Sequence, residues 1–404
     1  MNNTPKSLRM HIAIFGRTNV GKSSFLNAIV GQDISITSEI AGTTTDVVEK
    51  AMELLPIGPV NFLDTAGIDD ETILGRLRIE KTEKVFDRSD LIILLVEPNK
   101  WTEYEERIID QAKSRKIPFF ICMTKIDIIT PTQDFIAIMA MKTEDILYFS
   151  AYDSLNRGEY LEEFRKILIK VMPEEFLKTP SLLGDLVRPG GLVVLMVPID
   201  LQAPKGRLIL PQVQAIRDIL DNDAITMVVK EREYRHVYSL LNRKPDLIVC
   251  DSQVVLKMVA DTPEDVKCTT FSILFSRLKG DFRTFVRGAE AIDNLKVGDK
   301  ILIAEACSHH VLEDDIGRVK IPRWLEQYTG ISLKFDVYSG KDYPDNLAEY
   351  KLVLHCGACM INRRLMLTRF QKAISLGVEV TNYGMAISKC QGVLRRVIKP
   401  FDIF

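Results

Sequence analysis

The chain has almost no net charge. Among its 404 residues, 53 Lys and Arg stand against 55 Asp and Glu, which gives a formal charge of −2. A large excess of one sign would draw the protein towards nucleic acid or towards an anionic membrane, and that excess is missing here. We therefore expect neither a nucleic-acid partner nor a membrane partner, while a local basic patch is compatible with this balance.

Long apolar runs and low-complexity tracts are also missing. Hydrophobic residues make up 46% of the chain and charged residues 27%, which is the composition of a folded protein. The longest apolar region, 182–199, is interrupted by Asp185, Arg188 and Pro189, which excludes a simple membrane span. No signal peptide is recognisable at the start, so we expect a cytoplasmic protein. The length predicts two or three domains.

Cysteine is scarce, with seven residues in the whole chain. So few thiols in a long chain of this kind argue against a disulfide framework, and they direct attention to metal or redox chemistry.

The stretch from Gly16 to Ser23 reads Gly-Arg-Thr-Asn-Val-Gly-Lys-Ser, the spacing of a phosphate-binding loop. An apolar strand is expected before it, at 11–15, and a helix after it, at 24–30. The two glycines let main-chain N–H groups converge on an anion, Lys22 adds a charge, and Ser23 offers a hydroxyl to magnesium. This pattern predicts a nucleoside triphosphate site.

Two further segments fit the same site. The threonine-rich loop 41–46 suits a nucleotide sensor, because a threonine hydroxyl there can join Ser23 on magnesium only while a γ-phosphate is present. The strand 60–63 runs into Asp64, which can hold a magnesium-bound water, and Gly67 follows with an N–H that can meet the γ-phosphate.

A base-recognition motif follows the strand 119–123, which ends in Thr124-Lys125-Ile126-Asp127. The Asp127 carboxylate can accept the N1 and N2 protons of guanine, which adenine does not offer, and the lysine stem can lie along the base. The loop 149–152 is expected to close over the base.

Alternating strands and helices over residues 1–173 predict a doubly wound, mostly parallel α/β sheet. Prolines and a Gly-Gly pair mark a boundary after the helix 160–172. We expect two smaller α/β domains beyond it, one at 180–264, which shows no chemistry of its own and suits self-association, and one at 265–404.

Together these motifs resemble the translation-factor-like small GTPases, most closely the branch that contains MnmE (TrmE), Era and Der, over roughly residues 8–172. The resemblance implies catalytic roles for Lys22, Thr44, Asp64 and Gly67, with Ser23, Thr44 and Asp64 around magnesium. It implies GTP or GDP contacts from Gly16, Asn19, Val20, Gly21, Lys22, Ser23, Ser24, Thr124, Lys125, Asp127, Ser150 and Ala151.

Two residues depart from the motifs that are usual in these GTPases. Thr124 stands where the family usually has asparagine, which weakens the expected contact to the base without changing specificity. Ile68 follows Asp64-Thr65-Ala66-Gly67, so no glutamine can orient the attacking water. In this branch a potassium ion offsets that loss, and Asn19 matches one of its ligands. The resemblance therefore implies slow, potassium-stimulated hydrolysis, although Asn19 could also serve only to shape the loop.

The remaining chemistry lies in the last third of the chain. Cys307, His309 and His310 follow the strand 301–303, and His355, Cys356 and Cys359 follow the strand 352–354. Ligands gather at the carboxyl ends of neighbouring parallel strands. Three thiolates and a histidine could hold zinc, and three thiolates could equally hold a 4Fe-4S cluster with one weakly bound iron. Spacing does not separate zinc from iron. A thioredoxin-type pair and unrelated buried cysteines are the other interpretations.

Over its full length the chain resembles the maturation GTPases of iron-iron hydrogenases, the HydF family. The resemblance implies a GTPase domain, a dimerisation domain (180–264) and an iron-sulfur cluster domain (265–404). It implies Cys307, Cys356 and Cys359 as ligands of a 4Fe-4S cluster, with His309 and His355 in the metal site and the fourth ligand left open. Cys122, Cys268 and Cys390 match no motif and are interpreted as structural.

In that family the protein is a scaffold. It receives a diiron precursor from two radical-SAM maturases and delivers it to the apo iron-iron hydrogenase, as a homodimer or a higher oligomer. The alternative is an RNA-acting GTPase, of the tRNA-modification or ribosome-assembly kind, whose cysteines hold structural zinc. The near-neutral charge and the lack of a recognisable KH or OB signature after residue 172 weigh against it.

Overall fold

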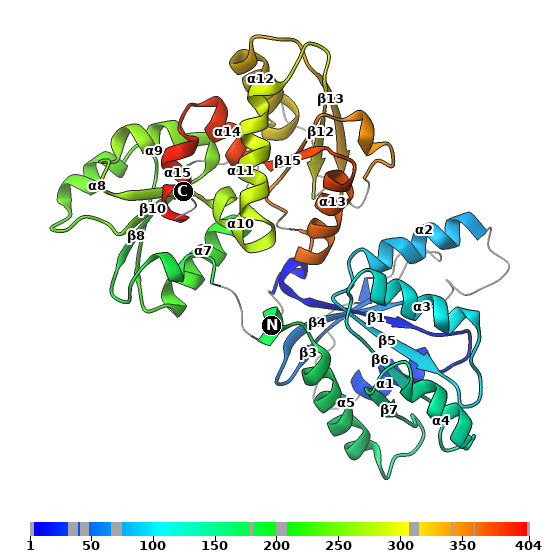
Figure 1. Cartoon of the computed structure of the whole chain (residues 1–404). Coiled ribbons are helices and arrows are strands. Elements are labelled where there is room, and N and C mark those ends of the chain that lie inside the picture. The colour runs from blue at the N-terminus through cyan, green and yellow to red at the C-terminus, as the bar shows by residue number, and fades with distance from the viewer. Residues whose placement is uncertain are drawn as a thin grey trace. The chain divides into compact units, whose positions relative to one another are not determined.

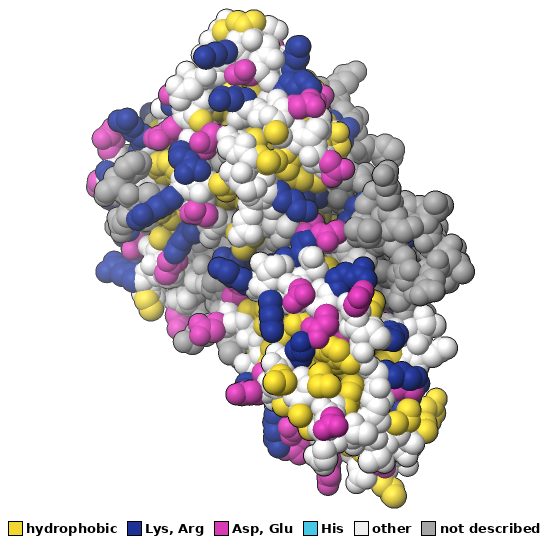
Figure 2. All heavy atoms as spheres, turned by 45° about the vertical axis from the view of Figure 1, so that its right-hand side comes forward, with side chains coloured by type: hydrophobic (Ala, Val, Ile, Leu, Met, Phe, Trp, Pro, Cys, Tyr) yellow, Lys and Arg dark blue, Asp and Glu magenta, His cyan; other side chains and the backbone are white. Residues whose placement is uncertain are grey.

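The structure is a computed structural model that describes residues 4–30, 39–40, 48–65, 75–177, 181–198, 208–306, 315–340, 343–358 and 360–401. The chain forms two compact units, Met1–Thr179 and Pro180–Phe404 (Figure 1). On the face drawn in Figure 2, positive and negative side chains are interspersed, as the balanced composition predicts. No helix of the described residues is long and apolar enough to cross a membrane.

The first unit is built on a seven-stranded sheet with the order β2-β3-β4-β1-β5-β6-β7 among the described residues. Strands β4, β1, β5, β6 and β7 are parallel, and β3 and β2 are added antiparallel at one edge. The strands are β1 Met10–Phe15, β2 Glu39–Ile40, β3 Val48–Leu54, β4 Gly58–Asp64, β5 Leu91–Val96, β6 Phe119–Met123 and β7 Ile146–Tyr148.

Helices cover both faces of this sheet. They are α1 Lys22–Val30, α2 Gly75–Phe86, α3 Glu103–Ser114, α4 Gln133–Ala140 and α5 Arg157–Val171, followed by the single turn α6 Glu174–Leu177. Successive residues of β1 belong to different clusters: Ile12 packs with α1 and α5, and Ala13 packs with α2, α3 and α4. Because neighbouring side chains of a strand point to opposite faces, the two clusters lie on opposite sides of the sheet. The doubly wound α/β prediction is confirmed.

The second unit contains two four-stranded parallel sheets. The first has the order β11-β10-β8-β9, with β8 Leu192–Met196, β9 Ile225–Val229, β10 Leu247–Cys250 and β11 Lys267–Thr270. Its helices are α7 Leu210–Asp221, α8 Tyr234–Leu240, α9 Val255–Asp261 and α10 Phe271–Lys279.

The second sheet has the order β13-β12-β14-β15, with β12 Lys300–Glu305, β13 Lys334–Ser339, β14 Leu352–His355 and β15 Glu379–Asn382. Its helices are α11 Phe282–Glu290, α12 Ile321–Thr329, α13 Arg363–Ser375, α14 Tyr383–Cys390 and α15 Leu394–Ile398. Short turns complete the fold: η1 Lys6–Leu8, η2 Gly184–Leu186, η3 Ser252–Val254, η4 Ala291–Asn294, η5 Ile316–Lys320, η6 Leu347–Glu349 and η7 Lys399–Phe401.

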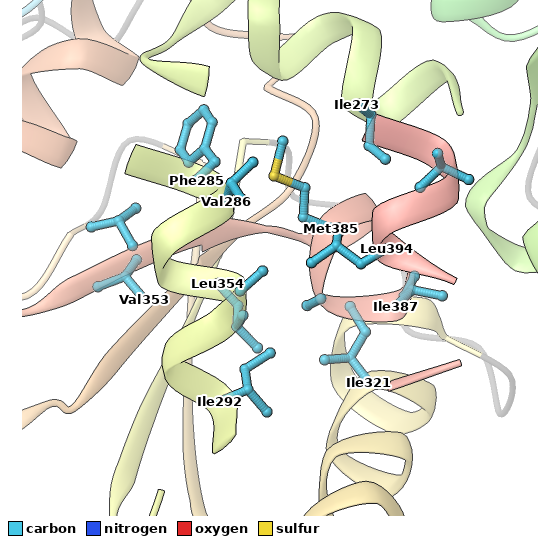
Figure 3. Close-up of a cluster of buried hydrophobic side chains, with 14 of the residues drawn as sticks. Ile273, Phe285, Val286, Ile292, Ile321, Val353, Leu354, Met385, Ile387 and Leu394 are labelled. Carbon is cyan, nitrogen blue, oxygen red and sulfur yellow. The ribbon is translucent and has the colours of Figure 1, made fainter. Parts of the chain in front are cut away.

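The two sheets of this unit share a hydrophobic core. Ile248 of β10 and Val353 of β14 belong to one buried cluster, and Ile273 of α10 lies in it with Met385 of α14 (Figure 3). A core shared in this way explains why residues 180–404 form one compact unit although their strands make two sheets. Both predicted smaller α/β parts are therefore present, and a domain boundary at 264–265 stays a prediction.

Candidate functional site

The phosphate loop connects β1 to the first residue of α1, Lys22. Gly16 has φ 156°, and a Cβ there would lie 2.8 Å from the carbonyl oxygen of Leu95 on β5, so only glycine fits this close approach. Asn19 has φ 62°, the left-handed conformation that asparagine tolerates better than most residues. Its identity therefore has a local conformational reason, whichever ligand it also contacts.

Lys22 is buried, and its Nζ donates to the carbonyl oxygens of Gly16 and Arg17, the latter at 2.9 Å. The Arg17 side chain is held on α3, where its guanidinium donates to both carboxylate oxygens of buried Glu105, at 2.8 and 2.6 Å. These contacts fix the first half of the loop against the sheet and against α3.

A cavity of about 410 Å³ opens beside this loop, within the size range of small-ligand sites. Of the predicted contacts, it is lined by Asn19, Val20, Gly21, Lys22, Ser23, Ser24, Thr124, Lys125, Asp127 and Ala151. The lining also contains Arg17 and Thr18 of the predicted phosphate loop, and Phe149 and Tyr152 of the loop expected to close over the base. Phe25 of α1 lines the cavity too and was not predicted, although it directly follows the motif residue Ser24. Gly16 and Ser150 do not line the cavity, and Ser150 instead accepts the N–H groups of Tyr152 and Asp153 and so shapes its loop.

Thr124 has a role that its residue type alone did not suggest. Its side chain is buried, and the hydroxyl lies 2.6 Å from the carbonyl oxygen of Val20 and 3.2 Å from that of Val96. The segment that carries Lys125 and Asp127 is thereby hydrogen-bonded to the phosphate loop. The two halves of the cavity are held together at this point.

Asp64 is the last residue of β4 and pairs in register with Ile14 of β1, the strand that leads into the phosphate loop. It is buried, and neighbouring Thr65 donates its hydroxyl to the Ile14 carbonyl at 2.7 Å. The sheet therefore delivers this carboxylate to the edge where the phosphate loop begins. Thr44 and Gly67 lie outside the described residues.

The cysteine segments begin at the ends of neighbouring strands. Strands β12 and β14 are parallel, with Ala304 paired to His355, as expected of a shared carboxyl edge. The Cys356 N–H donates to the Ala304 carbonyl at 2.9 Å, and the Ala306 N–H donates to the Cys356 sulfur at 3.0 Å. Ala306 directly precedes Cys307, so the main chain leading to one predicted ligand contacts the sulfur of another.

Three predicted members of the metal site, Cys307, His309 and Cys359, lie outside the described residues. Within the residues that the structure describes, no group of three or more His, Cys, Asp or Glu side chains is arranged to hold a metal ion. The set of metal ligands therefore stays a prediction, because the described residues contain only some of its members.

His355 is fully buried at the end of β14, and both of its ring nitrogens have partners. Nδ1 lies 2.9 Å from the Cys356 carbonyl oxygen, and Nε2 lies 3.3 Å from the Arg369 guanidinium. A carbonyl only accepts and a guanidinium only donates, so the proton sits on Nδ1. Burial and the positive charges of Arg369 and Lys279 lower the pKa of His355 to about 3, so the ring is neutral.

The cysteines outside this segment are in apolar surroundings. Cys122, Cys250 and Cys268 are fully buried in β6, β10 and β11, and burial raises the pKa of each thiol. Burial also raises the pKa of Cys390 to about 12. Thiols held in the neutral form are poor ligands and poor nucleophiles, in keeping with structural roles.

A glycine-rich turn between a buried parallel strand and a helix lines one cavity together with a guanine-type motif, and an aspartate ends the strand beside the one that leads into the turn. This combination defines a P-loop GTPase. Residues 11–125 match the family described as "50S ribosome-binding GTPase". Residues 182–280 match the "Hydrogen maturase F dimerization domain", and residues 283–400 match the "Hydrogen maturase F tetramerization domain". The last two matches together span a little over half of the chain, and the chain belongs to the hydrogen maturase F family.

Two curated relatives are similar over the GTPase part. The GTPase Der of Mycoplasmopsis agalactiae is 33% identical over 195 residues, which are 45% of this chain and 44% of that protein. The tRNA modification GTPase MnmE of Chromobacterium violaceum is 36% identical over 120 residues, 30% of this chain and 26% of that protein. The chain thus spans less than half the length of these relatives. A solved structure of Era from Aquifex aeolicus superposes with a TM-score of 0.33 at 22% identity, covering 57% of this chain and 98% of that one.

Proposed function

We propose that this protein is a GTP-hydrolysing scaffold that binds a 4Fe-4S cluster, assembles the diiron precursor of the hydrogenase active site and delivers it to the apo-hydrogenase. The observation that carries the proposal is the pairing of β12 with β14, which brings the Cys356 sulfur against the main chain leading to Cys307. That arrangement occurs in a chain of the hydrogen maturase F family.

The described residues fit an iron-sulfur cluster. Cys356 is only half-buried, whereas Cys122, Cys250 and Cys268 are fully buried. An N–H···S hydrogen bond of the kind made by Ala306 is one of the contacts that tune such clusters. We propose Cys307, Cys356 and Cys359 as the ligands. The bound cluster would supply an iron with an exchangeable position for an incoming group, and the chain's own residues orient the loop that presents it.

We also propose His309 and His355 as residues of the metal site. The contacts of the His355 ring limit what it can do there. The His355 ring would have to leave the Cys356 carbonyl or Arg369 before it could bind iron. In the described arrangement its Nδ1–H donates to the Cys356 carbonyl oxygen and so orients the main chain at that proposed ligand.

The nucleotide site supports slow hydrolysis stimulated by potassium. Ile68 follows the Asp64 motif, so no glutamine is available there, and Asn19 stands exposed on the cavity beside Lys22. Potassium held partly by Asn19 would supply the missing positive charge at the phosphates. Ser23, Thr44 and Asp64 are the residues that would hold magnesium. Turnover should rise when sodium is replaced by potassium, and equal turnover in the two salts would remove this part of the proposal.

GTP would act on partner docking rather than on the cluster. The nucleotide site and the cysteine segments lie in different compact units with separate cores. The proposed partners are the radical-SAM maturases, the apo iron-iron hydrogenase and further copies of this chain, the last supported by the dimerization and tetramerization matches. Because linkage is reciprocal, cluster loading should then leave the GDP Kd of the isolated protein unchanged.

The test measures GTP hydrolysis and iron content in two variants of the full chain, each purified without oxygen. Lys22→Ala should abolish GTP hydrolysis and leave iron content and the brown absorption of the cluster unchanged. Cys356→Ser should lower the iron content and leave hydrolysis unchanged. Loss of both properties in each variant would contradict the proposal.

The metal also separates the proposal from its alternative. A colourless protein that carries zinc and binds RNA with a steep salt dependence would favour the RNA-acting GTPase instead.

A further inference from the structure

Lys279, the last residue of α10, is one of the most buried side chains of the second unit, with 2% of its surface exposed. An ammonium group withdrawn from water is unfavourable unless hydrogen bonds compensate it. Its Nζ donates to the carbonyl oxygen of Ala358 at 2.5 Å and to that of Ile361 at 3.1 Å. These two carbonyls belong to residues on either side of Cys359 in the sequence.

The chain at Ala358 needs such support. Ala358 is fully buried and has φ 53°, a left-handed conformation that residues with a Cβ adopt only when surrounding structure holds them there. Its carbonyl, which Lys279 holds, also accepts the Ile361 N–H at 3.4 Å. In the opposite direction, the Arg363 side chain donates to the Leu278 carbonyl at 3.2 Å. The end of α10 and this turn therefore exchange hydrogen bonds both ways.

A second buried cation lies at the start of the same loop. Arg369 of α13 is 3% exposed, and its guanidinium contacts His355 and the Gly340 carbonyl, the latter at 2.8 Å. Both Arg369 and Lys279 act electrostatically on the His355 ring, so their positive potential reaches the residue before Cys356. A cluster held by three thiolates is anionic, and fixed positive charge in a water-poor setting stabilises it.

We propose that Lys279 is a positioning residue of the cysteine site. It holds the main chain on both sides of Cys359 in the conformation that receives the cluster, and it places a fixed positive charge beside that cluster. The inference rests on the proposed function. Lys279 also links two regions of the chain, because it lies in the region that matches the dimerization domain and its acceptors lie in the region that matches the tetramerization domain.

Two variants of the full chain separate the hydrogen bonds from the charge. Lys279→Met removes both, whereas Lys279→Gln keeps an N–H donor without the charge. After anaerobic reconstitution with iron and sulfide, Lys279→Met should bind iron about 10-fold or more weakly, as is typical when a residue supporting a metal ligand is removed. Lys279→Gln should retain more of the iron, and the midpoint potential of its cluster, followed by electron paramagnetic resonance, should shift to a more negative value. Lys351→Met, at an exposed lysine before β14, is the matched control and should behave as the wild type.

A measurement on the iron-free protein tests positioning independently of the metal. Hydrogen–deuterium exchange should accelerate in the peptide 356–365 of Lys279→Met, while the peptide 300–305 of β12 keeps its protection. Wild-type iron loading in Lys279→Met overturns the inference, and so does a uniform loss of protection across both sheets, which would assign Lys279 to general stability. A wild-type protein that takes up no iron would instead refute the proposed function, and the exchange result would still decide the role of Lys279.

Discussion

Replacing Thr124 with valine removes the hydroxyl that connects the two halves of the nucleotide site. That hydroxyl lies 2.6 Å from the Val20 carbonyl oxygen, and both residues are almost fully buried, with exposures of 4% and 3%. Valine has nearly the same shape, so little packing is lost. What changes is that a buried acceptor loses a donor, which costs about 1–3 kcal/mol.

The cost should be visible in stability and in nucleotide binding. Val20 belongs to the phosphate loop, and Thr124 leads into Lys125 and Asp127, which face the other end of the cavity. Phosphates and base are bound together only if these two segments keep their relative position. In nucleotide-free Thr124→Val, the phosphate loop can shift because the Val20 carbonyl no longer accepts from residue 124. GDP binding then has to restore the original position of the loop. We expect GDP affinity to fall about 5-fold or more, the equivalent of about 1 kcal/mol.

The assay is a fluorescence titration with labelled GDP, accompanied by urea unfolding of the same samples. Thr124→Ser keeps the hydroxyl and should retain the affinity. Thr130→Val, at an exposed threonine six residues after Thr124, controls for the loss of a surface hydroxyl. If Thr124→Val binds GDP and unfolds like the wild type, the hydrogen bond to Val20 does not hold the site together and the reasoning fails.

Two further predictions concern the same unit. Tyr152 lines the cavity and is 80% exposed, so we expect it to stack on the base; Tyr152→Ala should lose about 1–3 kcal/mol of GDP binding in the same titration, whereas Tyr152→Phe should not. Burial disfavours ionisation of Glu49, but Arg88 and Lys6, each 2.5 Å away, outweigh it and hold the pKa of this carboxyl well below its usual range. The contribution of the ionised Glu49 to the free energy of unfolding is therefore complete above the unfolded pKa of about 4.3 and is lost as pH falls towards the folded pKa. The free energy of unfolding of Glu49→Gln should be about 3 kcal/mol lower than that of the wild type at pH 7, and this difference should disappear in acid. A difference that is independent of pH would contradict this.

The elements with strong periodic patterns could be predicted from the sequence. The apolar strand before the phosphate loop and the strand 119–123 are found as β1 and β6. Weaker patterns gave shifted limits: a strand expected at 60–63 is β4 at Gly58–Asp64, because its pairing with β3 runs from Gly58 to Asp64. Strand limits of this kind are set by the partner strand, which the local sequence does not contain.

Sequence predicted where the cysteine segments begin but not what holds them. Cysteine and histidine reveal themselves by residue type, and strand ends of a parallel sheet gather in one place, so the approach of Cys356 to the chain before Cys307 was foreseeable. Lysine at the end of a helix, by contrast, normally suggests a solvated residue near the negative end of the helix dipole.

What makes Lys279 different is the identity of its acceptors, which are main-chain carbonyl oxygens some eighty residues further along the chain. Any residue has a carbonyl, so no side-chain pattern marks the partner, and a local pattern cannot distinguish a buried lysine from an exposed one. The same holds for Thr124, whose hydroxyl contacts the main-chain carbonyl oxygen of Val20. In both places the residues to which we assign the chemistry can be recognised in the sequence, while the residues that set the main chain around them become visible only when distant segments are brought together.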